Sequence, residues 1–68
     1  METHELVLKY IQGQQNYDSI RKSLGINATL DSVHTILASL LHKHIDDYAT
    51  PEGIARSITD DMVSMFKL

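Results

Sequence analysis

The stretch that decides the fold runs from residue 17 to residue 45. It reads YDSIRKSLGI over residues 17–26 and, after Asn27-Ala28, TLDSVHTILASLLHKHI over residues 29–45. In both parts, apolar residues recur three or four positions apart, which is the spacing of one face of an α-helix. Gly25 stands between them, where a helix often ends in a left-handed backbone conformation. The stretch predicts two helices joined by a turn, and this unit occupies residues 16–45.

The rest of the chain predicts one further helix on each side of that unit. Thr3 is a suitable cap for a helix over residues 3–12, and Gly13 follows its end. Thr50 and Pro51 suit the cap and first position of a helix over residues 51–67. For the two central helices, the expected caps are Asn16 and Thr29.

We therefore predict an all-α fold in which residues 1–68 form one compact four-helix domain. Residues 46–50 are the one stretch for which the sequence leaves a short extended segment as an alternative. The expected apolar faces of the first and last helices consist of Leu6, Val7, Tyr10 and Ile11, and of Ile54, Ile58, Met62, Met65 and Phe66.

The size of the chain limits its stability. Sixty-eight residues without a cysteine allow a small core and no disulfide or thiolate metal site. We favour a second copy of the chain, a homodimer, as the source of additional stability. No apolar run reaches the roughly 18 residues that a membrane span needs. Residues 1–5 lack the basic and apolar features of a secretory signal, so we expect a cytoplasmic protein without a membrane partner.

The charge of the chain bears on nucleic-acid binding. The net charge is −3, and all of it arises from residues 46–68, because residues 1–25 and 26–45 each sum to zero. Phosphate neutralisation supplies most non-specific DNA affinity, so this small number of cations disfavours a DNA-binding monomer. A dimer whose acidic tails face away from the duplex would keep these negative charges away from the phosphates.

The central stretch resembles the helix-turn-helix and winged-helix superfamily of DNA-binding domains. The resemblance covers about residues 6–45. The matching positions are Ile20, Leu24, Gly25 and Ile26, together with Val33, Ile36 and Leu37 on the inward face of the second helix. It implies that the helix over residues 30–45 is a recognition helix that enters the major groove.

The chain departs from that family in three ways. Arg21 stands where the family usually has a small residue, and the interval from Gly25 to Val33 is about two residues longer than the tightest turn. A helix after Thr50 replaces the β-hairpin wing, which is absent or vestigial.

The outward side of the predicted recognition helix carries the candidate DNA contacts. Ser and Thr can bond to bases or phosphates, but the more discriminating Arg, Asn and Gln are missing there. The alternative is a solvated polar face on a small helical bundle. On this helix the candidate DNA-contacting residues are Ser32, Thr35, Ser39, His42 and Lys43, and on the preceding helix they are Arg21 and Lys22. Among them, the cations Arg21, Lys22 and Lys43 are the candidates for phosphate contacts.

No grouping of residues indicates catalysis or a metal site. His42 and Asp46 stand four apart, but no third ligand is assured, and we expect local pairing of His42 with Asp46 and of Lys43 with Asp47. Asp60 and Asp61 point about 100° apart on a helix, so we expect them to face solvent. The sequence predicts neither an enzyme nor a cofactor, metal or small-molecule substrate.

The end of the chain is the candidate interface. Methionine and phenylalanine make adaptable contacts of large area, although core packing is the simpler interpretation of the same apolar face. The candidate dimer or partner interface consists of Ile58, Met62, Met65, Phe66 and Leu68.

Two functions follow from these features. The leading hypothesis is a small DNA-binding transcriptional regulator, acting as a dimer. The alternative is a non-enzymatic protein-binding modulator, such as an accessory or inhibitor protein of a mobile element. A purely structural assembly subunit is a third class.

Overall fold

Four helices build the described part of the chain. The computed structural model describes residues 2–47 and 50–68, and these residues contain no strand. The helices are α1 (Thr3–Ile11), α2 (Tyr17–Leu24), α3 (Leu30–His44) and α4 (Pro51–Phe66). The prediction of an all-α four-helix fold is confirmed. In the stretch 46–50, Asp46 and Asp47 form a turn, and residues 48 and 49 lie outside the described part.

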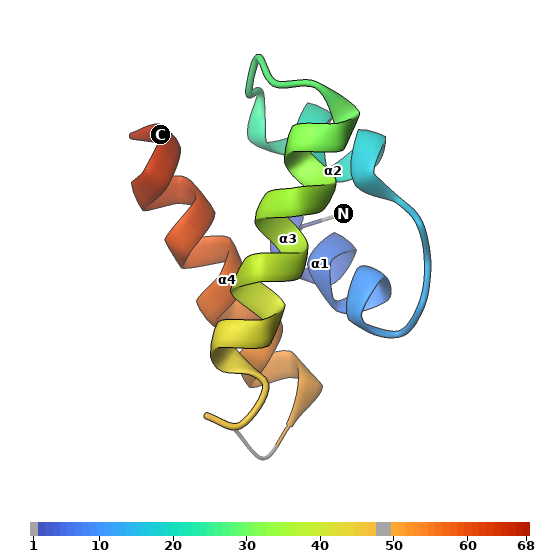
Figure 1. The fold of residues 1–68 in the computed structure, drawn as a ribbon, viewed down its shortest axis with the longest axis vertical. Coiled ribbons are helices and arrows are strands. Elements are labelled where there is room, and N and C mark those ends of the chain that lie inside the picture. The colour runs from blue at the N-terminus through green and yellow to red at the C-terminus, as the bar shows by residue number, and fades with distance from the viewer. Residues whose placement is uncertain (1, 48–49) are drawn as a thin grey trace.

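The helices pack around one small core. α1 packs most extensively against α4, while α2 contacts both α1 and α3. In Figure 1, α3 runs along the front of the molecule, and α4 lies beside its last turns and diverges from its first turns. The buried apolar residues are Val7, Ile20, Val33, Leu37, Leu40, Ile54, Ala55, Ile58 and Met62.

Both sides of the predicted turn contribute to that core. Ile20 of α2 and Val33 and Leu37 of α3 are completely buried. Leu24, Ile26 and Ile36 are partly buried and pack against the same cluster. Burial of a large aliphatic side chain contributes about 1.5–3 kcal/mol, so these contacts fix α2 and α3 relative to each other.

Local signals set several helix ends as expected. The Thr29 hydroxyl accepts a hydrogen bond from the Ser32 amide at 3.1 Å, and the Thr50 hydroxyl accepts one from the Gly53 amide at 3.2 Å. Gly25 adopts a left-handed conformation with φ of 67°. The Ile26 amide then donates to the Arg21 carbonyl, which satisfies a free carbonyl at the end of α2.

Thr3 is not the cap of α1, and Asn16 occupies its predicted cap position without a capping bond, because tertiary contacts use both side chains differently. Thr3 is already the first residue of α1, and Glu2 occupies the cap position. The Thr3 hydroxyl lies 2.6 Å from that of Ser23 in α2. Asn16 precedes α2, but its side chain donates to the Leu6 carbonyl at 2.9 Å instead of capping the helix. Both polar groups therefore connect α1 to α2.

No helix in residues 2–47 or 50–68 is long and apolar enough to cross a membrane.

Candidate functional site

The turn between α2 and α3 is held by Arg21. Its Nη1 donates to the Ala28 carbonyl at 3.3 Å, and its Nη2 pairs with the Asp18 carboxylate at 2.5 Å. One side chain thus connects the body of α2 to the last part of the extended turn. Sequence reasoning treated Arg21 as a phosphate contact and missed this role. The spacing of Asp18 and Arg21, three apart on a helix, was the available signal.

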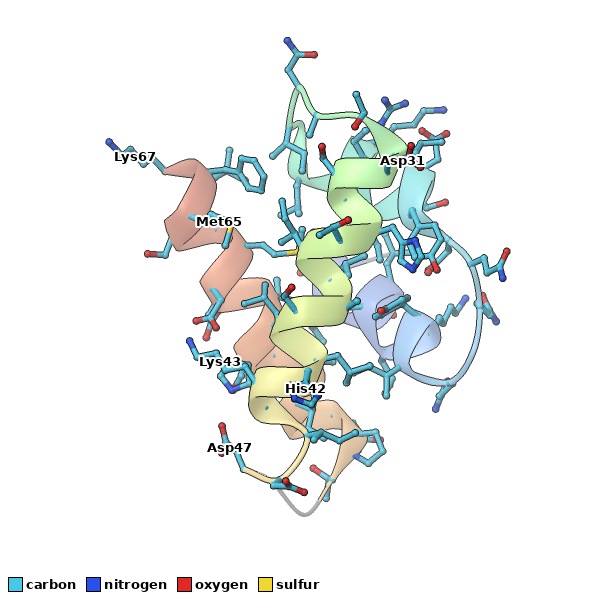
Figure 2. The ribbon with its side chains drawn as sticks, viewed as in Figure 1. Asp31, His42, Lys43, Asp47, Met65 and Lys67 are labelled. Atoms are coloured by element: carbon cyan, nitrogen blue, oxygen red, sulfur yellow. The ribbon has the colours of Figure 1, made fainter. Side chains whose placement is uncertain are left out.

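The outward face of α3 is open to solvent. Ser32, Thr35, Ser39 and His42 are all exposed. A shallow cavity of about 320 Å³ lies on the first half of the helix, lined by Asp31, Ser32, Thr35 and Ile36. Figure 2 shows Asp31 near the beginning of α3 and His42 near its end. The structure therefore gathers four of the candidate contact residues on one free helix face.

The three predicted cationic contacts all lie close to carboxylates. Arg21 and Lys22 both pair with Asp18, the latter at 3.1 Å. Lys43 Nζ lies 3.3 Å from Asp61 Oδ2 on α4. Lys22 and Arg21 lower the pKa of Asp18, so this carboxylate stays charged. Although each exposed pair adds little stability, the two carboxylates offset two of the three positive charges that a phosphate backbone would meet.

A row of aromatic rings supports the other flank of α3. The ring centroids of Tyr17 and His34 are 4.7 Å apart and nearly parallel, and those of Tyr10 and Tyr17 are 5.6 Å apart and tilted. Burial, followed by the nearby Tyr17, raises the pKa of Tyr10. The row joins α1, α2 and α3. Sequence reasoning did not predict this stack.

The predicted pairs of His42 with Asp46 and of Lys43 with Asp47 are wrong. Instead, His44 lies between two carboxylates: Nδ1 is 2.9 Å from Asp47 Oδ2, and Nε2 is 2.7 Å from Asp61 Oδ2. Asp61 is half-buried against α3, so the expectation that it faces solvent is also wrong; Asp60 is exposed. The reason is the packing of α3 on α4, which brings residues 17 positions apart together.

No group of three His, Cys, Asp or Glu side chains within residues 2–47 and 50–68 has a geometry that could hold a metal ion.

The candidate interface on α4 divides into buried and exposed residues. Ile58 and Met62 are completely buried in the core of the chain itself, so they cannot form an outer contact surface. Met65 and Leu68 are 52% and 57% exposed, and Phe66 is half-buried. Figure 2 shows Met65 and Lys67 at the end of α4, where this helix diverges from α3. The apolar stripe of α4 therefore continues for about one turn beyond the core.

Comparison of the chain with protein-family models, with curated protein sequences and with solved structures found no match.

Proposed function

We propose that the chain is a non-enzymatic protein-binding modulator that presents the outward face of α3 to a protein partner. The observation that carries this proposal is the cavity lined by Asp31, Ser32, Thr35 and Ile36 on the exposed face of α3. Its lining combines one partly buried apolar side chain with two exposed hydroxyls and an exposed carboxylate.

These lining residues suit a protein more than a nucleic acid. Ile36 offers an apolar contact, and the Ser32 and Thr35 hydroxyls can donate or accept hydrogen bonds. Asp31 favours a neighbouring cation on the partner and repels a phosphate. An apolar side chain of the partner that is flanked by Lys or Arg matches both properties. The paired state of Arg21, Lys22 and Lys43 supports the same choice.

The second part of the proposal is dimerisation through the last turn of α4. Met65 and Leu68 each leave more than half of a large apolar side chain in water, next to the partly buried Phe66. Covering such surface contributes about 25 cal/mol per Å². A chain of this size has little stability to spare, and a second copy that covers the two side chains supplies more.

A comparison of bait variants tests partner binding. Thr35→Arg places a large cation in the cavity at an exposed position, and Gln15→Arg adds the same charge at an exposed position outside the helices. Proteins retained by the wild type and by Gln15→Arg should be lost with Thr35→Arg. Equal retention of the same proteins by all three baits contradicts the proposal.

DNA-binding regulation is the second candidate, because the arrangement of α2, Gly25 and α3 leaves the polar face of α3 accessible. In this alternative, α3 approaches the major groove and Lys22 and Lys43 exchange their carboxylate partners for phosphates. Wild-type chain should then bind duplex DNA at low salt, and the double variant Lys22→Glu, Lys43→Glu should not. If the wild type shows no salt-dependent binding to any duplex, the regulator function fails.

A further inference from the structure

His44 is the most buried polar residue among those described, at 9% exposure. It is the last residue of α3, and its ring faces two elements at once. Nδ1 is directed at Asp47 in the following turn, and Nε2 at Asp61 in α4. The Asp47 amide also donates to the His44 carbonyl at 3.0 Å. The ring therefore joins the end of α3, the turn and the middle of α4.

The two contacts determine the protonation state of the ring. A neutral imidazole has one N–H group and one lone pair, whereas an imidazolium has two N–H donors. A neutral ring would direct its lone pair at a carboxylate oxygen less than 3 Å away, which is repulsive. Only the charged ring donates to both carboxylates at the observed distances. Hydrogen bonds of this charge-assisted type are about twice as strong as neutral ones.

We propose that His44 is a proton-dependent clasp, whose charged ring fastens the end of α3 and the following turn to α4 and whose deprotonation releases the turn. Within the described residues, the charged groups that act on the ring are Lys43 of α3, Asp47 of the turn and Asp61 of α4. The two carboxylates favour the charged ring, and Lys43 disfavours it. The negative pair outweighs the single ammonium.

The contact that is lost first is the one to Asp47. The Asp61 contact is the shorter of the two, and Asp61 Oδ2 also binds Lys43 Nζ, which holds this carboxylate in place. The side chain of Asp47 is 52% exposed and can turn into solvent at little cost. A neutral ring therefore keeps its proton on Nε2, donates to Asp61 and leaves Asp47 unbound.

The direction of the pH effect follows from this geometry. Hydrogen bonds to Asp61 and then to Asp47 raise the pKa of His44 above the ordinary value of 6.5. The folded state thus binds the proton more tightly than the unfolded state. The stabilisation is complete below the unfolded pKa and disappears as the pH rises through the folded pKa.

Two measurements test the clasp. First, nitrogen-detected NMR of the wild type at about pH 6.5 should show protons on both ring nitrogens of His44, and at higher pH a proton on Nε2 alone. Second, the urea midpoint of the wild type should fall between about pH 6 and about pH 9, and this fall should be absent in His44→Gln.

His42→Gln is the matched control, since His42 is exposed and two positions away on the same helix. This variant should keep the wild-type fall. A wild-type ring with one proton at about pH 6.5, or an unchanged pH dependence in His44→Gln, overturns the proposal. If His44→Gln does not fold, the NMR measurement on the wild type alone decides.

Discussion

The Arg21 guanidinium donates to the Ala28 carbonyl across the turn between α2 and α3, at a distance of 3.3 Å. The same group pairs with Asp18, so a single arginine closes the loop that is longer than in the tightest helix-turn-helix units. Asn27, in the same turn, is exposed and adds nothing to the core. The hydrogen bond from Arg21 therefore gives the turn a defined shape without a buried side chain at this position.

Arg21→Ala should destabilise the fold by about 1 kcal/mol, because it removes a hydrogen bond and a partly exposed ion pair. Lys22→Ala is the control, since the Lys22 side chain shares Asp18 but forms no hydrogen bond with the turn, and the substitution keeps the backbone bond from the Gly25 amide; its effect should stay within about 0.5 kcal/mol. Urea unfolding measures both. Equal losses in the two variants would show that Arg21 does not hold the turn.

Substitutions of Gly25 and Lys67, which are both left-handed at a helix end, should respond in opposite directions. Gly25→Ala should lower the free energy of unfolding by about 1 kcal/mol. An added Cβ would meet no neighbouring atom within 4 Å, so the cost comes from the φ of 67° alone. Lys67 has a φ of 57° without being glycine, and Lys67→Gly should be neutral or stabilise by up to about 1 kcal/mol. Thermal unfolding of both variants checks this, and a stabilising Gly25→Ala would contradict it.

Substitutions of Met62 and Met65 should distinguish the contribution of core packing from that of self-association. Met62→Ala should cost about 2–5 kcal/mol at every protein concentration, because Met62 is completely buried. Met65→Asp should leave the fold of the single chain intact and abolish the proposed dimer, because Met65 is half exposed. Sedimentation and urea unfolding distinguish the two effects. A wild type that is monomeric at high concentration contradicts the dimer.

The contribution of Asp61 to the stability of the fold should be lost at acidic pH. The hydrogen bond from His44, followed by contacts with Lys43, lowers the pKa of Asp61 below its ordinary value of 3.8. Its stabilisation is therefore present above the unfolded pKa and is lost as the pH falls through the folded pKa. The wild type should lose stability below about pH 4 more steeply than Asp61→Asn, as measured by acid unfolding. Parallel acid profiles would contradict this role.

The sequence predicted the features that depend on local chemistry. The periodicity around Val33 and Leu37, the cap at Thr29 and the left-handed Gly25 all depend on neighbours within a few positions, and each is observed. The exposed outward face of α3 followed from the same periodicity, because its polar side is opposite its buried side.

The features that depend on packing between helices were not predictable in this way. The pairing of His44 with Asp61 requires knowledge of which turn of α4 meets the end of α3. By sequence, Asn16 is as suitable a helix cap as Thr29. In the structure, however, α1 lies close enough for the Asn16 side chain to donate to the Leu6 carbonyl instead. Similarly, the apolar stripe of α4 does not reveal where the core stops, and hence that Met62 is inside and Met65 outside.

Site-specific photo-crosslinking tests the proposed binding face of α3 most directly. A photoreactive residue in place of Thr35 lies at the cavity, and one in place of Gln15 is the exposed control. The proposed function predicts one discrete protein adduct from position 35 and none from position 15. A nucleic-acid adduct at position 35, or equal adducts from both positions, would contradict it.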